Sequence, residues 1–319
     1  MRRSATAAAE DTNAPAPSAS PAELYADAAR WRPPATDLDH PSLGRVEDHA
    51  LGGDASWAID RLWYQEAVRA VPYLPLAFRI AHGFVGRAFD TAYSAGIRRF
   101  LLVGDALPYR NAVVARALAF PGSRVVHAGR DRCSKAHWTC FAQQQRAPIE
   151  WVTSDFAVPG TILYAEPTRR LLNDGDPVGL VLANALETVH DTDAATAALR
   201  ACTDRLPPGS MVIAAHPSTD GLDPGERDLA ERMHELYEDD GPAPQPPGFL
   251  RPPRRRLRTA EEFARLLDGL DLLPPGIVHA DDWHNPRPTF HDPAYSLCLA
   301  AVAALPERRP STGPAGTAA

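Results

Sequence analysis

Five short apolar runs, each followed by a segment with helical features, constrain the fold of this chain more than any other feature. The runs are Arg98–Val103, Arg124–Ala128, Ile149–Thr153, Val178–Ala183 and Ser210–Ala215. Strands that are apolar on both faces and separated by helices are typical of a parallel sheet that is covered on both sides. Because crossovers between parallel strands are right-handed, few topologies remain. The sequence therefore predicts an α/β fold.

The segments around these runs predict helices and two further strands. The expected helices are Ile59–Ala70, Leu76–Ser94, Asn111–Ala119, Ser134–Gln145, Pro167–Leu172, a segment from Asp191 or Thr192 to Arg205, Gly225–Tyr237, and one that starts at the capping box Thr259-Ala-Glu-Glu262. Leu272–His279 and Tyr295–Ala303 read as closing strands joined by a short loop, which indicates an antiparallel pair at one edge. We therefore expect a mostly parallel, seven-stranded sheet.

The composition divides the chain into four parts. Residues 1–38 and 306–319 are rich in Ala, Pro and Ser and are expected to be disordered tails. Between them we expect a helical segment over 39–95 and a Rossmann-like domain over 96–305. The stretch 239–256 is too proline-dense for a helix or a central strand, and indicates a loop or lid.

Net charge and cysteine content limit the classes of binding partner and the cellular compartments that we expect. A net charge of −7 argues against nucleic-acid binding as the main function. The basic cluster Arg254–Arg256 is either a solvated loop or a contact for an anionic ligand. Four cysteines without a C-x-x-C pair fit reduced thiols in the cytoplasm. No signal peptide and no apolar run of membrane length is visible, so we expect no membrane association.

The first apolar run leads into the loop Gly104-Asp-Ala-Leu-Pro108. In open α/β sheets, ligands bind outside the carboxyl ends of the strands, so this loop is the expected cofactor site. A nicotinamide fingerprint needs three glycines as G-x-G-x-x-G, and this loop has only the first. A nicotinamide cofactor is therefore not expected.

Five segments together resemble the actinobacterial S-adenosylmethionine-dependent methyltransferase-like family, once listed as a domain of unknown function. PSLGRVEDHALGGDASWAIDR, starting at Pro41, is similar to that family's PSxARVYDYxLGGKDNFxADR. AGIRRFLLVGDALP resembles AGIRQFLDIGTGLP, and RVVHAGRD resembles RVVYVDND. DPVGLVLANALETVHD resembles RPVALLLVAVLHFVPD, and LPPGSMVIAAH resembles LxPGSYLVLSH. The resemblance implies a class I methyltransferase fold, S-adenosylmethionine as cofactor and a small-molecule acceptor.

The resemblance also implies which residues hold the cofactor. They are Gly104, Asp105, Ala106, Asp131, Asp155 and Asn184. Asp155 corresponds to the acid that accepts a hydrogen bond from the adenine amine. The chain departs from the family at Leu102 and Gly129, where acids are expected, and at Ala106, where a glycine is expected. Two alternatives to a methyltransferase stay open: a non-methylating binding or regulatory protein, and an enzyme for another small-molecule reaction.

Methyl transfer needs alignment more than a fixed catalytic group, although a base helps when the acceptor must lose a proton. The candidates at the ends of the fourth and fifth runs are Asn184, Glu187, His190 and His216. His216 and Glu187 are the preferred catalytic residues, with His216 first because it follows a buried strand. Four aromatic residues of the N-terminal segment could wall an acceptor pocket, although core packing is the simpler role. They are Trp57, Trp63, Tyr64 and Tyr93.

A metal site is not expected, although histidines and aspartates gather near the carboxyl end of the chain. They are His279, Asp281, Asp282, His284, His291 and Asp292, and their spacing matches no known set of metal ligands.

Overall fold

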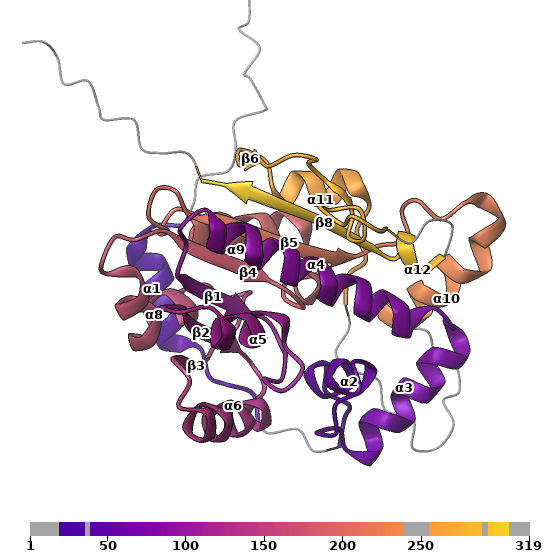
Figure 1. Ribbon diagram of the computed structural model, residues 1–319, viewed down its shortest axis with the longest axis horizontal. Coiled ribbons are helices and arrows are strands. Elements are labelled where there is room, and N and C mark those ends of the chain that lie inside the picture. The colour runs from indigo at the N-terminus through magenta and orange to yellow at the C-terminus, as the bar shows by residue number, and fades with distance from the viewer. Residues whose placement is uncertain (1–18, 36–38, 239–254, 289–292, 306–319) are drawn as a thin grey trace, which may run out of the picture.

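The computed structural model describes residues 19–35, 39–238, 255–288 and 293–305, and its centre is one sheet (Figure 1). The strands are β1 (Arg99–Val103), β2 (Arg124–Gly129), β3 (Ile149–Thr153), β4 (Val178–Leu182), β5 (Met211–Pro217), β6 (Asp271–Leu272), β7 (Val278–His279) and β8 (Cys298–Ala304). Their order is β3-β2-β1-β4-β5-β8-β6, and β7 also pairs with β8. The first five strands are parallel, whereas β8 is antiparallel to β5. The predicted class I methyltransferase topology is confirmed.

Helices cover both faces of the sheet because successive strand residues point to opposite sides. One face packs against α7 (Gly160–Leu163), α8 (Glu166–Leu172), α9 (Thr192–Thr203) and α11 (Ala260–Leu266). The other face packs against α4 (Leu74–Ser94), α5 (Ala112–Ala119), α6 (Arg132–Gln145) and α12 (Pro293–Ser296). In β1, for example, Leu101 belongs to the first core and Leu102 to the second.

A third apolar cluster lies beyond the sheet. It joins α2 (Leu43–Ala50), α3 (Ala58–Ala70), the first half of α4, and α10 (Arg227–Tyr237). Figure 1 shows these helices together on one side of the molecule. Since α4 contributes to this cluster and also lies on the sheet, it joins the N-terminal helices to the Rossmann-like part. Within the described residues, no helix has both the length and the apolar character needed to cross a membrane.

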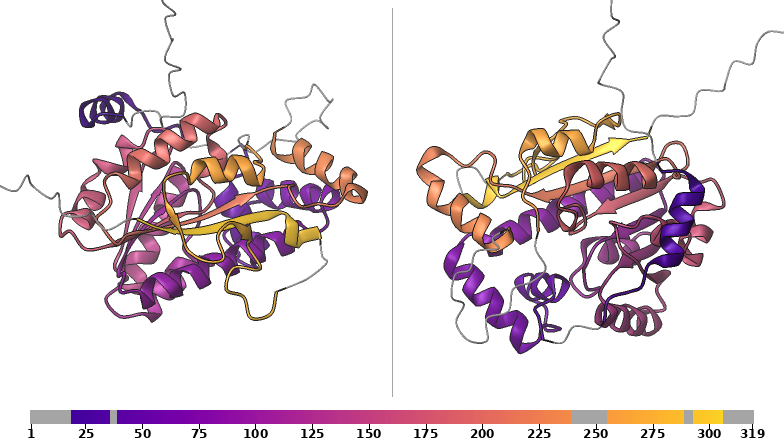
Figure 2. Two further views of the ribbon diagram at one scale, coloured as in Figure 1. Left: turned by 90° about the horizontal axis from the view of Figure 1, so that it is seen from above. Right: turned by 180° about the vertical axis from the view of Figure 1, so that it is seen from behind.

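Some expected elements differ from the structure. Within the expected N-terminal tail, Pro21–Arg30 form α1, which begins with a complete Ser20–Glu23 capping box and buries Leu24 against Leu163. In the view from behind, α1 lies on the outside of the molecule (Figure 2). The expected strand Leu272–His279 is two short strands, β6 and β7, because a turn at Pro274, Pro275 and Gly276 interrupts it.

Two further differences are local. The last expected strand starts at Cys298 rather than Tyr295, since α12 precedes it. Helix α2, Leu43–Ala50, lies in the expected helical segment but was not expected as a separate helix. Short 3-10 helices, η1 (Leu186–Thr188) and η2 (Pro224–Glu226), follow β4 and β5. Residues 239–254 of the proline-dense stretch lie outside the described residues.

Candidate active site

The loop after β1 is fixed by contacts with β2, α6 and the residue that follows β4. Gly104 has φ +130°, and a Cβ atom there would lie 2.0 Å from the Ala183 carbonyl oxygen, so only glycine fits. His127 Nε2 lies 2.6 Å from the Gly104 carbonyl oxygen, and Trp138 Nε1 donates to the Ala106 carbonyl at 2.8 Å. Burial lowers the pKa of His127 to about 3, so its ring is neutral and donates from Nε2. Ala106 has no positive φ, so its methyl group adds no backbone strain.

Helix α2 lies directly on this loop. A Cβ atom at Gly44 would be 3.1 Å from the Ala106 backbone, so a small residue permits the close contact. The helix ends in a Schellman motif, in which Gly53 N donates to the Asp48 carbonyl and Gly52, with φ +83°, donates to His49. A side chain at Gly53 would collide with the Asp48 carboxylate. The Leu-Gly-Gly block therefore ends the helix that covers the loop.

The end of β2 has a different shape from the one that the family resemblance implies. A Cβ atom at Gly129 would lie 2.7 Å from the Trp151 ring, so the indole fills the space that an acidic side chain would enter. Asp131 caps α6 by accepting from Cys133 N at 2.8 Å, and it also accepts from Ser134 Oγ at 2.8 Å. It lies 3.7 Å from Arg45 Nη1. Part of the hydrogen-bonding capacity of Asp131 is thus already used by the fold.

Restoring the acid at Gly129 should therefore be unfavourable on its own. We expect Gly129→Asp to lower the free energy of unfolding by about 1–3 kcal/mol, because it overpacks the Trp151 ring. The double variant Gly129→Asp, Trp151→Val removes the ring, so its loss relative to Trp151→Val alone should be smaller. Urea unfolding of the four proteins measures both differences. Equal losses in the two backgrounds would mean that Trp151 does not block this position.

Two hollows meet beside the loop. The first, here called the loop cleft, is lined by residues that include Asp105, Arg130, Asp131, Thr188 and Arg255. Asp105 Oδ1 accepts from Arg130 N at 3.2 Å, and burial raises the pKa of its carboxyl group. Asp155 lies close by, because its Oδ2 is 3.4 Å from Arg130 Nε. The structure thus brings three of the predicted carboxylates to one side of the loop.

The second hollow, here called the apolar cavity, runs from the loop between α4, α10, the end of β5 and the start of β8. Its empty volume, including the open mouth, is about 800 Å³. Most of its wall is hydrocarbon, with Phe78 and Val85 from α4, Met233 from α10, and Leu297 before β8. Leu102, which stands in place of an acid, also lines it. Of the predicted site residues, Ala106, Asn184 and Glu187 face this cavity.

Two carboxylates project into this largely apolar space. Glu47 Oε2 accepts from Asn184 Nδ2 at 2.6 Å, and burial raises the pKa of Glu47 to about 7. Glu187 is 2% exposed, and its Oε1 lies 3.5 Å from Arg255 Nη1. Its other oxygen, Oε2, is buried and has no hydrogen-bond partner among the described residues. Burial also raises the pKa of Glu187.

His216 does not face the apolar cavity, so its side chain does not point out of the sheet edge as expected. Its neighbours Ala215 and Pro217 line the cavity, whereas the alternation along β5 turns His216 to the opposite side, next to Phe263. His216 is fully buried, with Nδ1 2.7 Å from the Pro217 carbonyl and Nε2 2.9 Å from Arg258 Nη1. Because Arg258 can only donate, Nε2 accepts and the proton lies on Nδ1. Burial lowers the pKa of His216 to about 3, so the ring is neutral.

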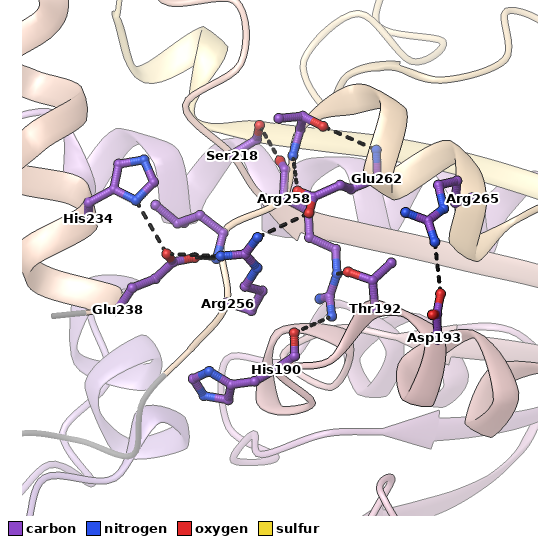
Figure 3. A network of polar contacts seen from close by, with 12 residues as sticks. His190, Thr192, Asp193, Ser218, His234, Glu238, Arg256, Arg258, Glu262 and Arg265 are labelled. Carbon is purple, nitrogen blue, oxygen red and sulfur yellow. Dashed lines mark hydrogen bonds and ion pairs between the residues drawn. The ribbon is translucent and has the colours of Figure 1, made fainter. Parts of the chain in front are cut away.

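Arg258 and Arg256 fix the segment that leads to α11 (Figure 3). Arg258 donates to the carbonyl groups of Leu186 at 3.0 Å and Val189 at 2.6 Å, on either side of Glu187. Arg256 pairs with Glu238 at 3.3 Å and Glu262 at 3.0 Å. Of the two alternatives for this cluster, a solvated loop does not fit the buried Arg255, whereas Arg256 is half-exposed but paired with carboxylates. Arg254 lies outside the described residues.

The remaining candidates have other roles. His190 is exposed, and its carbonyl accepts from Arg258 at 3.5 Å. The four aromatic candidates are not among the cavity-lining residues; Trp57, for instance, stacks on Arg45, and Tyr93 stacks on Arg98. In the part of the chain that the structure describes, no three His, Cys, Asp or Glu side chains gather as metal ligands. His291 and Asp292 lie outside that part.

Two residues of the site, Glu47 and Trp151, were not among the sequence candidates, whereas Arg255 was named only as part of a basic cluster. Of the two, Glu47 carried a usable signal. It stands where the family motif PSxARVYDYxLGG has its first tyrosine, so it is a departure inside the block that carries the resemblance most specifically. No local pattern marks Trp151, and the basic cluster that marks Arg255 does not tell which residues it contacts, because Glu187 is 68 positions away.

Comparisons with known proteins support this architecture. A family model described as S-adenosyl methyltransferase matches residues 29–306. A crystal structure from Thermobifida fusca, provisionally titled a methyltransferase, is 25% identical, has a TM-score of 0.71 and covers 87% of this chain and 99% of its own. A DUF574 family protein from Streptomyces avermitilis is 26% identical, has a TM-score of 0.69 and covers 85% and 99%. The comparison with curated proteins gives no match. Because the family model spans most of the sequence, the chain belongs to the S-adenosyl methyltransferase family.

Proposed function

We propose that this S-adenosylmethionine-dependent methyltransferase methylates a small, largely apolar acceptor that binds in the apolar cavity. One observation carries the proposal: a hydrocarbon-walled cavity starts at the cofactor loop and is lined by two carboxylates, the half-buried Glu47 and the buried Glu187. Such cavities, with a few convergent polar groups, are typical of small-molecule sites. We also propose that the protein works in the cytoplasm, which its four free cysteines support.

The residues present fit the cofactor at its cationic end. The sulfonium and ammonium groups of S-adenosylmethionine need nearby negative charge, and Glu187 offers a buried oxygen, Oε2, that no described residue partners. We assign the loop cleft to the nucleoside, with Asp155 at the adenine amine. Because Gly129 supplies no acid, Asp105 and Asp131 are the carboxylates left to accept from the ribose hydroxyls.

When bound, the cofactor supplies an electrophilic methyl group on sulfur. The work of the chain is to align the acceptor with that methyl group and to exclude water, because an in-line displacement gains most from proximity. The walls from α4 and α10 exclude water from the cavity. The loop at Gly104–Ala106, fixed by His127 and Trp138, gives the cofactor a rigid support.

Ligand-induced stabilisation tests the cofactor assignment. S-adenosylhomocysteine at about 100 times its dissociation constant should raise the free energy of unfolding by about 2.7 kcal/mol, because it binds only the folded state. Asp155→Ala should remove most of this increase, measured relative to its own ligand-free form. Asp193→Ala is the matched control, since Asp193 is an exposed surface acid.

Two results would count against this placement. A full increase in Asp155→Ala would mean that the adenine lies elsewhere. No increase in the unaltered protein at millimolar ligand would favour the non-methylating alternative.

A further inference from the structure

The two carboxylates of the apolar cavity differ in how their charges are balanced. Glu187 has a guanidinium partner, Arg255, at 3.5 Å. Among the described residues, the side chain of Glu47 has the neutral amide of Asn184 as its hydrogen-bond partner, at 2.6 Å. A half-buried carboxylate that faces a largely apolar cavity without a contacting cation is unfavourable, so this position favours a ligand that brings a positive charge.

The other described groups around Glu47 do not offset its burial, although the positive charge of Arg255 lowers its pKa. The titratable and charged groups are Asp48 on α2, His82 on α4, Glu187 on η1, Tyr237 on α10, Arg255, and Cys298 on β8. Burial lowers the pKa of His82 and raises the pKa values of Tyr237 and Cys298 to about 12, so all three are neutral near pH 7. Arg255 is the positive group among these described residues, and it already contacts Glu187.

We propose that the acceptor is a small apolar compound with a primary or secondary amine, and that the Glu47 carboxylate binds its ammonium group and takes its proton. The proposal rests on the proposed function, since the methyl donor is the cofactor described above. Phe78, Val85 and Leu297 would contact the hydrocarbon part. Glu187 stays with the cationic end of the donor, so each carboxylate has its own positive group.

The chemistry of this step balances without a further reactant. The ammonium group gives one proton to Glu47 and becomes a neutral amine with a free electron pair. The amine nitrogen then forms a bond to the methyl carbon as the carbon–sulfur bond breaks, and the electron pair of that bond goes to sulfur. The product is a methylated ammonium ion, and the proton on Glu47 passes to solvent. A carboxyl group with a pKa of about 7 is suited to this exchange near neutral pH.

A pair of probes of nearly equal shape tests the class of acceptor. Calorimetry with 2-phenylethylamine and 2-phenylethanol, each in the presence of S-adenosylhomocysteine, compares a cation with a neutral analogue. We expect the amine to bind about tenfold tighter or better, because it makes a charge-assisted hydrogen bond. Glu47→Gln should lose this preference, whereas Glu66→Gln, on the exposed side of α3, should keep it.

The preference should also depend on pH. It should be larger at pH 8, where Glu47 is ionised, than at pH 6, where its carboxyl group is mostly protonated. In the protein without ligand, the raised pKa means that the folded state holds this proton more tightly than the unfolded state does. Stability from Glu47 is thus full below about pH 4.5 and is lost as the pH rises through 7. In urea unfolding, the free energy of unfolding of Glu47→Gln should therefore rise relative to that of the unaltered protein as the pH increases over this range.

The outcomes separate this inference from the proposed function. Binding of S-adenosylhomocysteine with equal affinities for the two probes, or an amine preference that survives in Glu47→Gln, overturns the amine assignment and leaves the methyltransferase site intact. A stability difference that does not change with pH also overturns it, because the Glu47 charge would then be balanced within the protein. Failure of S-adenosylhomocysteine to bind overturns both proposals.

Discussion

Gly104→Ala should lower the free energy of unfolding by about 2–5 kcal/mol and abolish binding of S-adenosylhomocysteine. The added Cβ atom would lie 2.0 Å from the Ala183 carbonyl oxygen, which is backbone and cannot rotate away. The φ of +130° adds a penalty of about 1–2 kcal/mol for any residue with a Cβ atom. Overpacking against β4 adds about 1–3 kcal/mol. Guanidinium unfolding and calorimetry measure the two effects.

Gly96→Ala is the matched control for this variant. Gly96 also has a positive φ, +96°, but a Cβ atom there meets nothing within 4 Å. It lies at the end of α4, away from the loop, so its replacement should cost only the backbone penalty, about 1–2 kcal/mol, and leave ligand binding unchanged. Equal losses for the two variants would show that the contact between the loop and the end of β4 does not fix the cofactor loop.

The sheet could be predicted because its evidence is local. Val178–Leu182 is a continuous apolar run, which predicts a strand buried on both faces without any knowledge of distant contacts. The antiparallel edge of the sheet was harder to predict. Leu272 and Val278 both pair with β8, but the turn between them divides the single strand that the sequence predicts. Helix α1 was missed because its surroundings are low in complexity, although Ser20 and Glu23 carry its capping signal.

The site could be predicted only in part, because it depends on contacts between distant segments. The carboxyl ends of β1 and β4 meet in any sheet of this topology, so Gly104 and Asn184 could be placed together. The same rule does not say which side of β5 faces the apolar cavity, and His216 points away from it while its neighbours Ala215 and Pro217 line it. Glu47 enters from a helix outside the sheet, and its contact with Asn184 spans 137 positions of the chain.

Departures from the family pattern also have more than one physical meaning. Leu102 in place of an acid, considered alone, indicates a weakened cofactor site. In the structure its side chain lines the same cavity as Glu47, so the wall is apolar at the strand while a carboxylate projects from α2. Gly129 differs in kind, since the Trp151 ring occupies the space beside it. The first change alters the wall of the apolar cavity, and the second alters the end of β2.

Arg258→Ala should destabilise the protein by about 3–5 kcal/mol, because the side chain is 2% exposed and holds several buried acceptors. Its removal leaves the carbonyl groups of Leu186 and Val189, together with His216 Nε2, without this donor. Arg258→Lys keeps a positive donor but loses the planar fork, so we expect an intermediate loss. The midpoints of urea unfolding should fall in the order unaltered protein, Arg258→Lys, Arg258→Ala.

Arg265→Ala separates this effect from the loss of a surface charge. Arg265 also belongs to the region in Figure 3, but its pair with Asp193 is exposed, so its removal should cost less than about 1 kcal/mol.

Arg258→Lys, which should still fold, carries the functional part of the test. Because Arg258 bonds on both sides of Glu187, a displaced η1 should weaken binding of S-adenosylhomocysteine, whereas Arg265→Ala should not. Unchanged affinity in Arg258→Lys, together with a clear loss of stability, would restrict Arg258 to a structural role.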